Sequence, residues 1–139
     1  MDVAGSTNTA CSSRAVGRAK RQWPSTIKPY HMAIPGYVYG GLIASLVDCH
    51  GTGTASAAAY RKEGREMETE PTLRFVTASL QVDFLRPTPM GPHLEIRGKI
   101  EEVKGRKVVV SATVSAGGEV CARGKVVAVQ MPEHLRPKA

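Results

Sequence analysis

The second half of the sequence alternates apolar and polar residues, and this period of two constrains the fold more than any other feature. In the segment FVTASLQVDF (75–84), apolar residues alternate with polar ones from Thr77 to Phe84. The segments HLEIRGKIEEV, VVVSATVSA and EVCARGKVVAVQM repeat the pattern, with turn residues at Gly105 and at Gly117-Gly118 between them. Such alternation is typical of strands with one buried face. The sequence therefore predicts four antiparallel strands in a meander between residues 75 and 131.

One long helix is predicted ahead of these strands, from Gly40 to about Lys62. Apolar and small residues of the helical period share one side of it, namely Leu42, Ile43, Leu46, Val47, Ala55, Ala58 and Ala59. Helix propensity alone predicts that the helix ends near His50, because the glycines and threonines of residues 51–54 are poor helix formers. The alternative is that these small residues let a sheet wrap closely around a longer helix. A single helix must pack across one face of the sheet, which is an α+β arrangement.

The composition is that of one globular domain. The chain has 139 residues, of which 42% are hydrophobic and 22% charged, so a core can form. Residues 1–22 are small, polar and basic without the apolar centre of a secretory signal, and we expect a disordered tail there, with an amphipathic organelle-targeting segment as the lower-ranked alternative. The folded domain is expected over residues 23–139, with room for an early short strand within residues 23–34. The apolar stretches are too short to span a bilayer, so no membrane is expected.

Charge and cysteine content narrow the function classes. The net charge is +7, yet no helix-turn-helix or zinc finger is present, and two Phe and one Trp are poor for base stacking. A small ligand bearing phosphates fits this basic excess as well as nucleic acid, which we rank last. Cys11, Cys49 and Cys121 form no CxxC pair, which argues against a disulfide framework and a zinc site. A reducing, cytoplasmic location is the simpler expectation.

Asp48 lies in the middle of the predicted helix, and burying an unpaired charge is costly. Gly40 precedes it by 48 − 40 = 8 positions, slightly over two helical turns, so both lie on nearly the same face. A helix N-terminus offers unpaired N–H groups and the positive end of the dipole, which can polarise a carbonyl. A carboxylate nearby can act as general base or as nucleophile. The alternative is a carboxylate satisfied by backbone donors or by Ser45.

These features together resemble the hotdog-fold acyl-CoA thioesterases of the PaaI-like superfamily. The resemblance covers residues 33–131 and is strongest in PGYVYGGLIASLVD (35–48) and VTASLQVDFLRPTPMG (76–91). It implies a hydrolase that cleaves acyl-CoA to a free acid and coenzyme A without a cofactor or metal. The Gly40 N–H would be the oxyanion donor and Asp48 the catalytic acid, since their spacing is that of the family. It also implies a homodimer at least, or a homotetramer, with the site between subunits.

The resemblance extends to further site residues. Related enzymes often place a Ser or Thr near the start of the first meander strand to orient water, and Thr77 matches this position. An ordinary strand residue is the equal alternative. Thr52, one turn after Asp48, is a second such candidate, although a small residue packed on the sheet is slightly favoured. Tyr39 and Gly41 flank the oxyanion glycine and are expected to contact substrate.

The basic predicted turn is a candidate for the phosphates of coenzyme A. Arg106 and Lys107 follow Gly105 there, and such cations bind phosphates through charge-assisted hydrogen bonds. A solvated basic turn is the alternative. The histidines His31, His50 and His93 match no metal pattern and are expected to be structural or surface residues.

Two departures from the family favour rival functions. Tyr39 stands where the family usually has His, and no Asn precedes the glycine pair in HMAIPGYV. These departures support a non-catalytic acyl-CoA-binding or interaction module as the alternative to an enzyme. A dehydratase or hydratase on the same fold ranks low, because no His stands where its His–acid pair would be.

Overall fold

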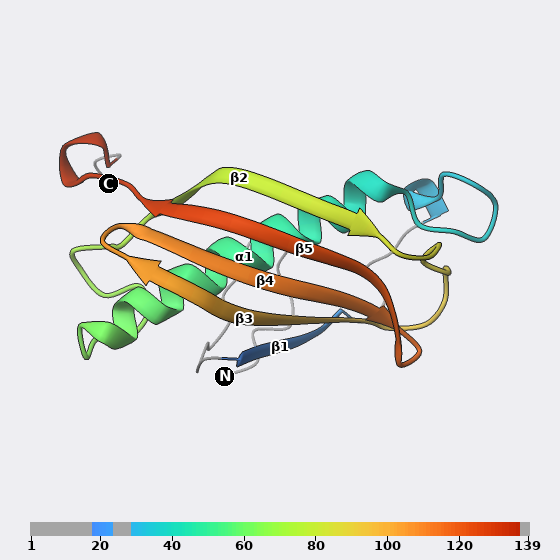
Figure 1. Ribbon diagram of the computed structural model, residues 1–139, viewed down its shortest axis with the longest axis horizontal. Coiled ribbons are helices and arrows are strands. Elements are labelled where there is room, and N and C mark those ends of the chain that lie inside the picture. Colours follow the sequence, from blue (N-terminus) through green and yellow to red (C-terminus); the bar gives the residue numbers. More distant parts are fainter. Residues whose placement is uncertain (1–17, 24–28, 137–139) are drawn as a thin grey trace.

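The computed structural model describes residues 18–23 and 29–136 and consists of one long helix against a five-stranded antiparallel sheet (Figure 1). The elements in chain order are β1 (Arg18–Trp23), the short 3-10 helix η1 (Pro29–His31), α1 (Gly40–Lys62), β2 (Phe75–Phe84), β3 (Leu94–Lys104), β4 (Lys107–Ala116), β5 (Glu119–Gln130) and η2 (Glu133–Leu135). The predicted α+β class, the helix bounds and the two tight turns are confirmed.

The order of strands in the sheet is β1-β3-β4-β5-β2, so the predicted four-strand meander is wrong. Only β3, β4 and β5 follow one another as hairpins, whereas β2 pairs with β5 at one edge of the sheet. The reason lies in residues 85–93, which hold three prolines and Gly91 instead of a tight turn. This segment hydrogen-bonds to the chain before α1, through Val38 N–H to Thr88 O (2.9 Å) and Met90 N–H to Gly36 O (2.8 Å). It therefore leads the chain away from β2 before β3 begins.

The first strand lies earlier than the sequence indicates. An early short strand is expected within residues 23–34, but β1 spans Arg18–Trp23 and pairs with β3 at the other edge of the sheet. The expected boundary between tail and domain, after residue 22, falls inside this strand. Residues 1–17, which make up most of the expected tail, lie outside the described part of the chain.

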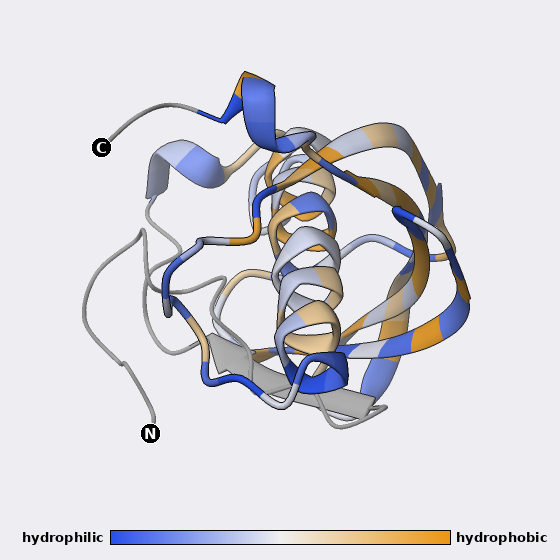
Figure 2. Cartoon of the chain, turned by 90° about the vertical axis from the view of Figure 1, so that its left-hand side faces the viewer, coloured by the Kyte–Doolittle hydropathy of each residue, from blue (hydrophilic) through white to orange (hydrophobic). Residues whose placement is uncertain are grey.

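Helix α1 runs for 23 residues, so it does not end near His50 as propensity alone would have it. The sheet curves around the helix (Figure 2), and glycines bring the two layers into close contact. A Cβ placed on Gly51 would lie 2.6 Å from the Cγ2 of Val126 on β5, and a Cβ on Gly124 would clash with Val47. Tertiary packing thus outweighs the poor helix propensity of residues 51–54, and the prediction that small residues allow close wrapping is confirmed.

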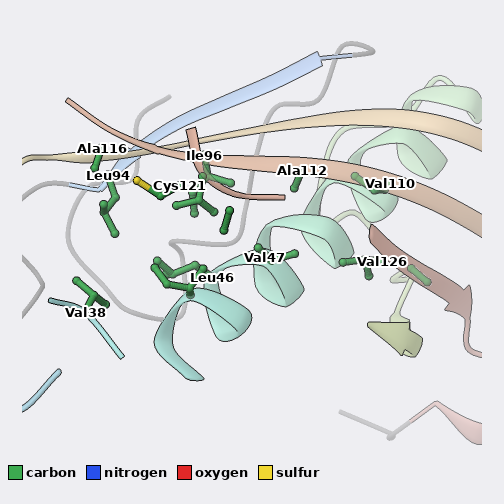
Figure 3. Close-up of a cluster of buried hydrophobic side chains, with 14 of the residues drawn as sticks. Val38, Leu46, Val47, Leu94, Ile96, Val110, Ala112, Ala116, Cys121 and Val126 are labelled. Carbon is green, nitrogen blue, oxygen red and sulfur yellow. The ribbon is translucent and has the colours of Figure 1, made fainter. Parts of the chain in front are cut away.

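The core fills the space between α1 and the concave face of the sheet. Figure 3 shows Leu46 of the helix below Leu94 and Ile96 of β3, and Val47 of the helix on the side toward Val126 of β5. Alternate residues of β3, β4 and β5 point into this core, as the period of two predicted. Strand β2 differs, because most of its residues are exposed. No helix in the described part of the chain has the length and apolar character needed to cross a membrane.

The cysteines differ from expectation. Cys121 is a buried free thiol, but Cys49 is disulfide-bonded, so the argument against disulfides from the scattered cysteine spacing is wrong for this residue. Pairing depends on which side chains meet in space, and spacing along the chain does not report that. Among residues 18–23 and 29–136, no three His, Cys, Asp or Glu side chains gather as they would around a metal ion.

Replacing Gly51 with alanine tests whether packing or propensity controls α1. Propensity alone predicts that Gly51→Ala stabilises the fold by about 1 kcal/mol. We expect the opposite sign, a loss of about 1–2 kcal/mol in the free energy of unfolding, because the new methyl overlaps Val126. Urea denaturation measures the difference. The control Ser45→Ala, at an exposed position of the same helix, should change stability by less than about 0.5 kcal/mol. A higher free energy of unfolding for Gly51→Ala would show that the contact between the helix and Val126 is loose.

Candidate active site

The N-terminus of α1 presents backbone N–H groups beside a ring from β2. Tyr39 is the N-cap residue in an extended conformation (ψ 148°) and gives the helix no side-chain cap. Within the described residues, the N–H groups of Gly40 and Gly41 have no backbone acceptor, whereas the Leu42 N–H donates to Tyr39 O at 3.2 Å. Two donors at the positive end of the helix dipole are therefore available to a carbonyl oxygen.

Aromatic rings lie close to both glycines and leave little room for a side chain at either position. A Cβ on Gly40 would lie 3.1 Å from the Cζ atom of Phe84, so the phenyl ring covers this glycine. A Cβ on Gly41 would lie 2.6 Å from the ring of Tyr39. Tyr39 itself is fixed by its N–H, which donates to His31 O at 2.9 Å, and its ring centroid lies 6.2 Å from that of His31. The residue that replaces the family's His thus packs on the first turn of the helix.

A cavity of about 410 Å³ opens next to Gly40. Its walls are mainly apolar and come from the chain before α1, the helix and the end of β2, namely Val38, Gly40, Ile43, Phe84, Leu85 and Pro87. Arg86 lies at its edge and forms an ion pair with Glu119 at 2.8 Å. Sequence reasoning missed Phe84 and this cavity, because nothing in the alternating pattern shows that Phe84 lies against the helix start.

Asp48 and Thr77 meet between α1 and β2. The Thr77 hydroxyl donates a hydrogen bond to Oδ1 of the half-buried Asp48 carboxylate. Ser45 does not satisfy Asp48, because its hydroxyl donates to the Gly41 carbonyl at 2.9 Å. The carboxylate is thus held by a side chain 29 positions away in the sequence, on the strand that also supplies Phe84 to Gly40. Both predicted catalytic positions of α1 therefore face β2.

The other predicted binding residues lie in two places. The Thr52 hydroxyl donates to the carbonyl oxygens of Asp48 (3.1 Å) and Cys49 (3.2 Å) within its own helix and not to the Asp48 carboxylate. Arg106 lies in the turn between β3 and β4, and Lys107 begins β4 and pairs with Glu102 at 3.2 Å. Gly105 of this turn shares a cavity with the last turn of α1, at the opposite end of the helix from Gly40. The structure therefore does not bring these cations to the glycine pair.

The predicted structural histidines lie apart from these groups. His50 is 2% exposed and packs under Gly98 of β3, where an added Cβ would lie 2.8 Å from its Nε2 atom. His93 is exposed at the start of β3, on the rim of a different hollow. His31 is half-buried, and its ring packs against Tyr30.

Comparison with known proteins identifies the family. The model of the thioesterase superfamily matches residues 35–123, well over half of the chain. This chain belongs to the thioesterase superfamily. A thioesterase superfamily protein from Shewanella loihica PV-4 has a solved structure with 54% sequence identity and a TM-score of 0.67, covering 84% of this chain and 86% of that one. The expected hotdog fold is confirmed by this likeness and by the helix wrapped in its sheet.

Curated relatives are similar over a shorter range. The acyl-coenzyme A thioesterase THEM4 of Xenopus laevis is 34% identical over 86 residues, which are 62% of this chain and 33% of that protein. The THEM4 protein of Rattus norvegicus is 31% identical over 86 residues, again 62% of this chain and 31% of the relative. The chain thus spans about a third of the length of these relatives.

A double-mutant cycle tests the Asp48–Thr77 hydrogen bond. We expect Thr77→Val to lower the free energy of unfolding by about 1 kcal/mol, because the partly buried carboxylate loses a donor. The same change made on an Asp48→Ala background, which has no side-chain acceptor, should cost less, with a coupling energy of about 0.5–1 kcal/mol by urea denaturation. Thr77→Ser is the matched control, since it keeps the hydroxyl. If the stability losses of the two single variants simply add in the double variant, the hydrogen bond contributes nothing to stability.

Proposed function

We propose that this chain hydrolyses acyl-CoA thioesters to a free acid and coenzyme A. The observation that carries the proposal is the Asp48 carboxylate, held by Thr77, on the helix whose N-terminus offers the N–H groups of Gly40 and Gly41. Similarity to acyl-coenzyme A thioesterases supports the substrate class. Membership of the thioesterase superfamily supports the reaction type.

The proposed mechanism uses these groups in sequence. The thioester carbonyl oxygen accepts a hydrogen bond from the Gly40 N–H, and the helix dipole stabilises the negative charge that develops on it. Asp48 takes a proton from water, whose oxygen forms a bond to the carbonyl carbon. The tetrahedral intermediate then breaks its carbon–sulfur bond, and the thiolate of coenzyme A leaves and takes up a proton. Thr77 orients the carboxylate through its hydrogen bond, and Tyr39 and Gly41 shape the first turn of α1.

The spacing along α1 decides whether Gly40 and Asp48 of one chain can act on the same thioester. Eight residues separate Gly40 and Asp48 by about 12 Å along the helix axis at 1.5 Å per residue. A carbonyl held at Gly40 is therefore not in direct contact with the Asp48 side chain. One water molecule, with a hydrogen bond of about 3 Å on either side, spans only about half of this distance, so we infer that Gly40 and Asp48 from different subunits of the proposed homodimer act on one thioester. We propose that Asp48 acts there as a general base on water, with direct attack by the carboxylate as the alternative.

Edge strand β2 supports the proposed homodimer. It is the last strand of the sheet next to the Asp48–Thr77 pair, and an open edge can pair with another chain. Several large apolar residues on and just after it are exposed by 40–55%, namely Val76, Leu80, Phe84 and Leu85. Covering this strand with a second copy would bury these side chains and shield the site from bulk water. A homotetramer remains the larger alternative, and a cytoplasmic location remains a prediction from the sequence.

Replacing the carboxylate tests the proposed activity. We expect Asp48→Asn to reduce the release of free thiol from a panel of acyl-CoAs by about 10³-fold, because the amide cannot take a proton from water. Circular dichroism and unfolding curves check that the variant folds. A single turnover in ¹⁸O-labelled water tests the route, since general-base catalysis places the labelled oxygen in the product acid.

Three results would contradict this proposal at different levels. Equal rates in wild type and Asp48→Asn would exclude the carboxylate from the reaction. An acid that carries an oxygen from Asp48 itself would replace the general-base route with nucleophilic attack. Binding of acyl-CoA without turnover of any substrate would favour the alternative function, a non-catalytic acyl-CoA-binding module, which the replacement of the family's His by Tyr39 supports.

A charge on the edge strand tests the dimer. We expect Leu80→Glu to convert the homodimer to monomers in sedimentation velocity experiments, because it would bury a carboxylate in the contact. Thiol release should fall together with the fraction of dimer. Gln81→Glu is the matched control, since it adds the same charge at the next, already polar position of β2. A wild-type protein that is monomeric and fully active would show that the site is complete in one chain.

A further inference from the structure

A second cavity, of about 450 Å³, lies between the last turn of α1 and the β3–β4 turn. Its walls are partly apolar and include Ala58, Ala59, Phe75, Val103 and Val108. Among the described residues that line it, Phe75 is the one aromatic side chain. Lys62 and Gln130 supply polar groups at the same cavity. Apolar walls with a few polar groups are the usual lining of a small-molecule site.

This cavity continues the surface that carries Asp48 and Thr77. Ala59 follows Asp48 by 11 residues, which is about 16 Å along the helix and about 20° around it, so both lie on one face of α1. Phe75 precedes Thr77 by two residues on β2, and the strand irregularity lies after Thr77, so these side chains share a face. A ligand extended along α1 from the carboxylate therefore reaches this cavity.

Lys62 lines the cavity, and two further cations flank the lining residue Gly105 in the sequence. Gly105 lines the cavity, and its neighbours Lys104 and Arg106 are exposed. In the described part of the chain, neither these two residues nor Lys62 forms an ion pair. Three cations without a carboxylate partner can bind phosphate groups more strongly than paired ones.

The nearby carboxylates do not cancel this charge. Glu63 also lines the cavity, but its carboxylate pairs with Arg65 at 2.6 Å. Glu102 pairs with Lys107 at 3.2 Å. The negative end of the α1 dipole lies here too, and Arg61 and Lys62 in the last turn compensate it. The mouth therefore keeps a net attraction for anions.

We propose that this cavity binds the nucleotide end of coenzyme A, with the base inside it and the phosphates at its mouth. This assignment rests on the proposed function. Phe75 offers a ring on which a base can stack, and the Gln130 amide can both donate to and accept from the polar edge of a purine. Lys62, Lys104 and Arg106 bind the phosphates. With the thioester beside Asp48 and the Gly40 N–H supplied by the second subunit, the extended arm that links the phosphates to the thioester spans the distance of about 16 Å from Asp48.

An acyl group that ends in a carboxylate is the alternative ligand for this cavity. Such a group would use the apolar walls and one cation. It would leave two of the three unpaired cations and the Gln130 amide without a partner. A diphosphate together with a 3′-phosphate uses all three cations. The nucleotide therefore fits the residues of the cavity better than an anionic acyl chain does.

Direct binding tests the site independently of catalysis. We expect wild-type protein to bind adenosine 3′,5′-bisphosphate in isothermal titration calorimetry, and Lys62→Met to weaken this binding about tenfold, because the change keeps length and removes charge. Phe75→Leu should also weaken it, since the stacking surface is lost. Lys125→Met, on the exposed face of β5, is the matched control and should bind as wild type does. A wild-type protein that does not bind the nucleotide would overturn the assignment.

Kinetics separate the two sources of negative charge. We expect Lys62→Met to raise KM for an acyl-CoA about tenfold with kcat unchanged, and to leave the constants for the matching acyl-pantetheine unaltered. A change confined to acyl groups with a terminal carboxylate would overturn the nucleotide assignment in favour of an anionic acyl end. A protein that turns over no acyl-CoA would refute the proposed hydrolase. If Lys62→Met still weakened nucleotide binding in that protein, the nucleotide site would stand. Turnover of acyl-CoA with constants that Lys62→Met leaves unchanged would refute the nucleotide site and keep the proposed hydrolase.

Discussion

The close contact between α1 and the sheet at Gly51 and Gly124 is the constraint on which the rest of the structure depends. Val126 of β5 fills the space over Gly51, and Val47 of the helix fills the space over Gly124. These two contacts set the distance and the rotation of the helix against β5. Because β2 pairs directly with β5, they also set where β2 lies relative to the helix. The Asp48–Thr77 hydrogen bond follows from that placement, since neither residue could reach the other across a thicker interface.

The same placement divides the helix into three zones that all face β2. Its first turn meets Phe84, its middle carries the carboxylate that accepts from Thr77, and its last turn borders the cavity with Phe75. Strand β2 thus contacts each chemically distinct part of α1, although it contributes little to the core. An edge strand suits this role, because side chains there are free of the tight packing that fixes β3, β4 and β5.

Local patterns in the sequence predicted the helix and the strands well. They predicted poorly which strands pair with one another. The helix bounds and the turns at Gly105 and Gly117-Gly118 follow from periodicity and from glycine, which are local properties. The position of β2 beside β5 could not be read from the sequence, because no tight turn joins β2 to either neighbour in the chain. The hydrogen-bond partner of Asp48 depends on that same pairing. The spacing of Gly40 and Asp48 was informative because both lie on one helix, where sequence distance converts directly to geometry.

The cavity at the end of α1 illustrates what sequence reasoning could not supply. From the sequence, Arg106 is a candidate phosphate ligand only because it follows a turn glycine, and such turns are usually solvated. The structure adds Lys62, which comes from the helix and lies at the same cavity as Gly105. Cations from two separate elements that meet at one cavity are harder to explain by solubility than a basic turn alone, because their mutual repulsion costs stability. Binding of an anionic ligand would relieve this repulsion, which is the physical basis for proposing that the phosphates bind at this end of the helix.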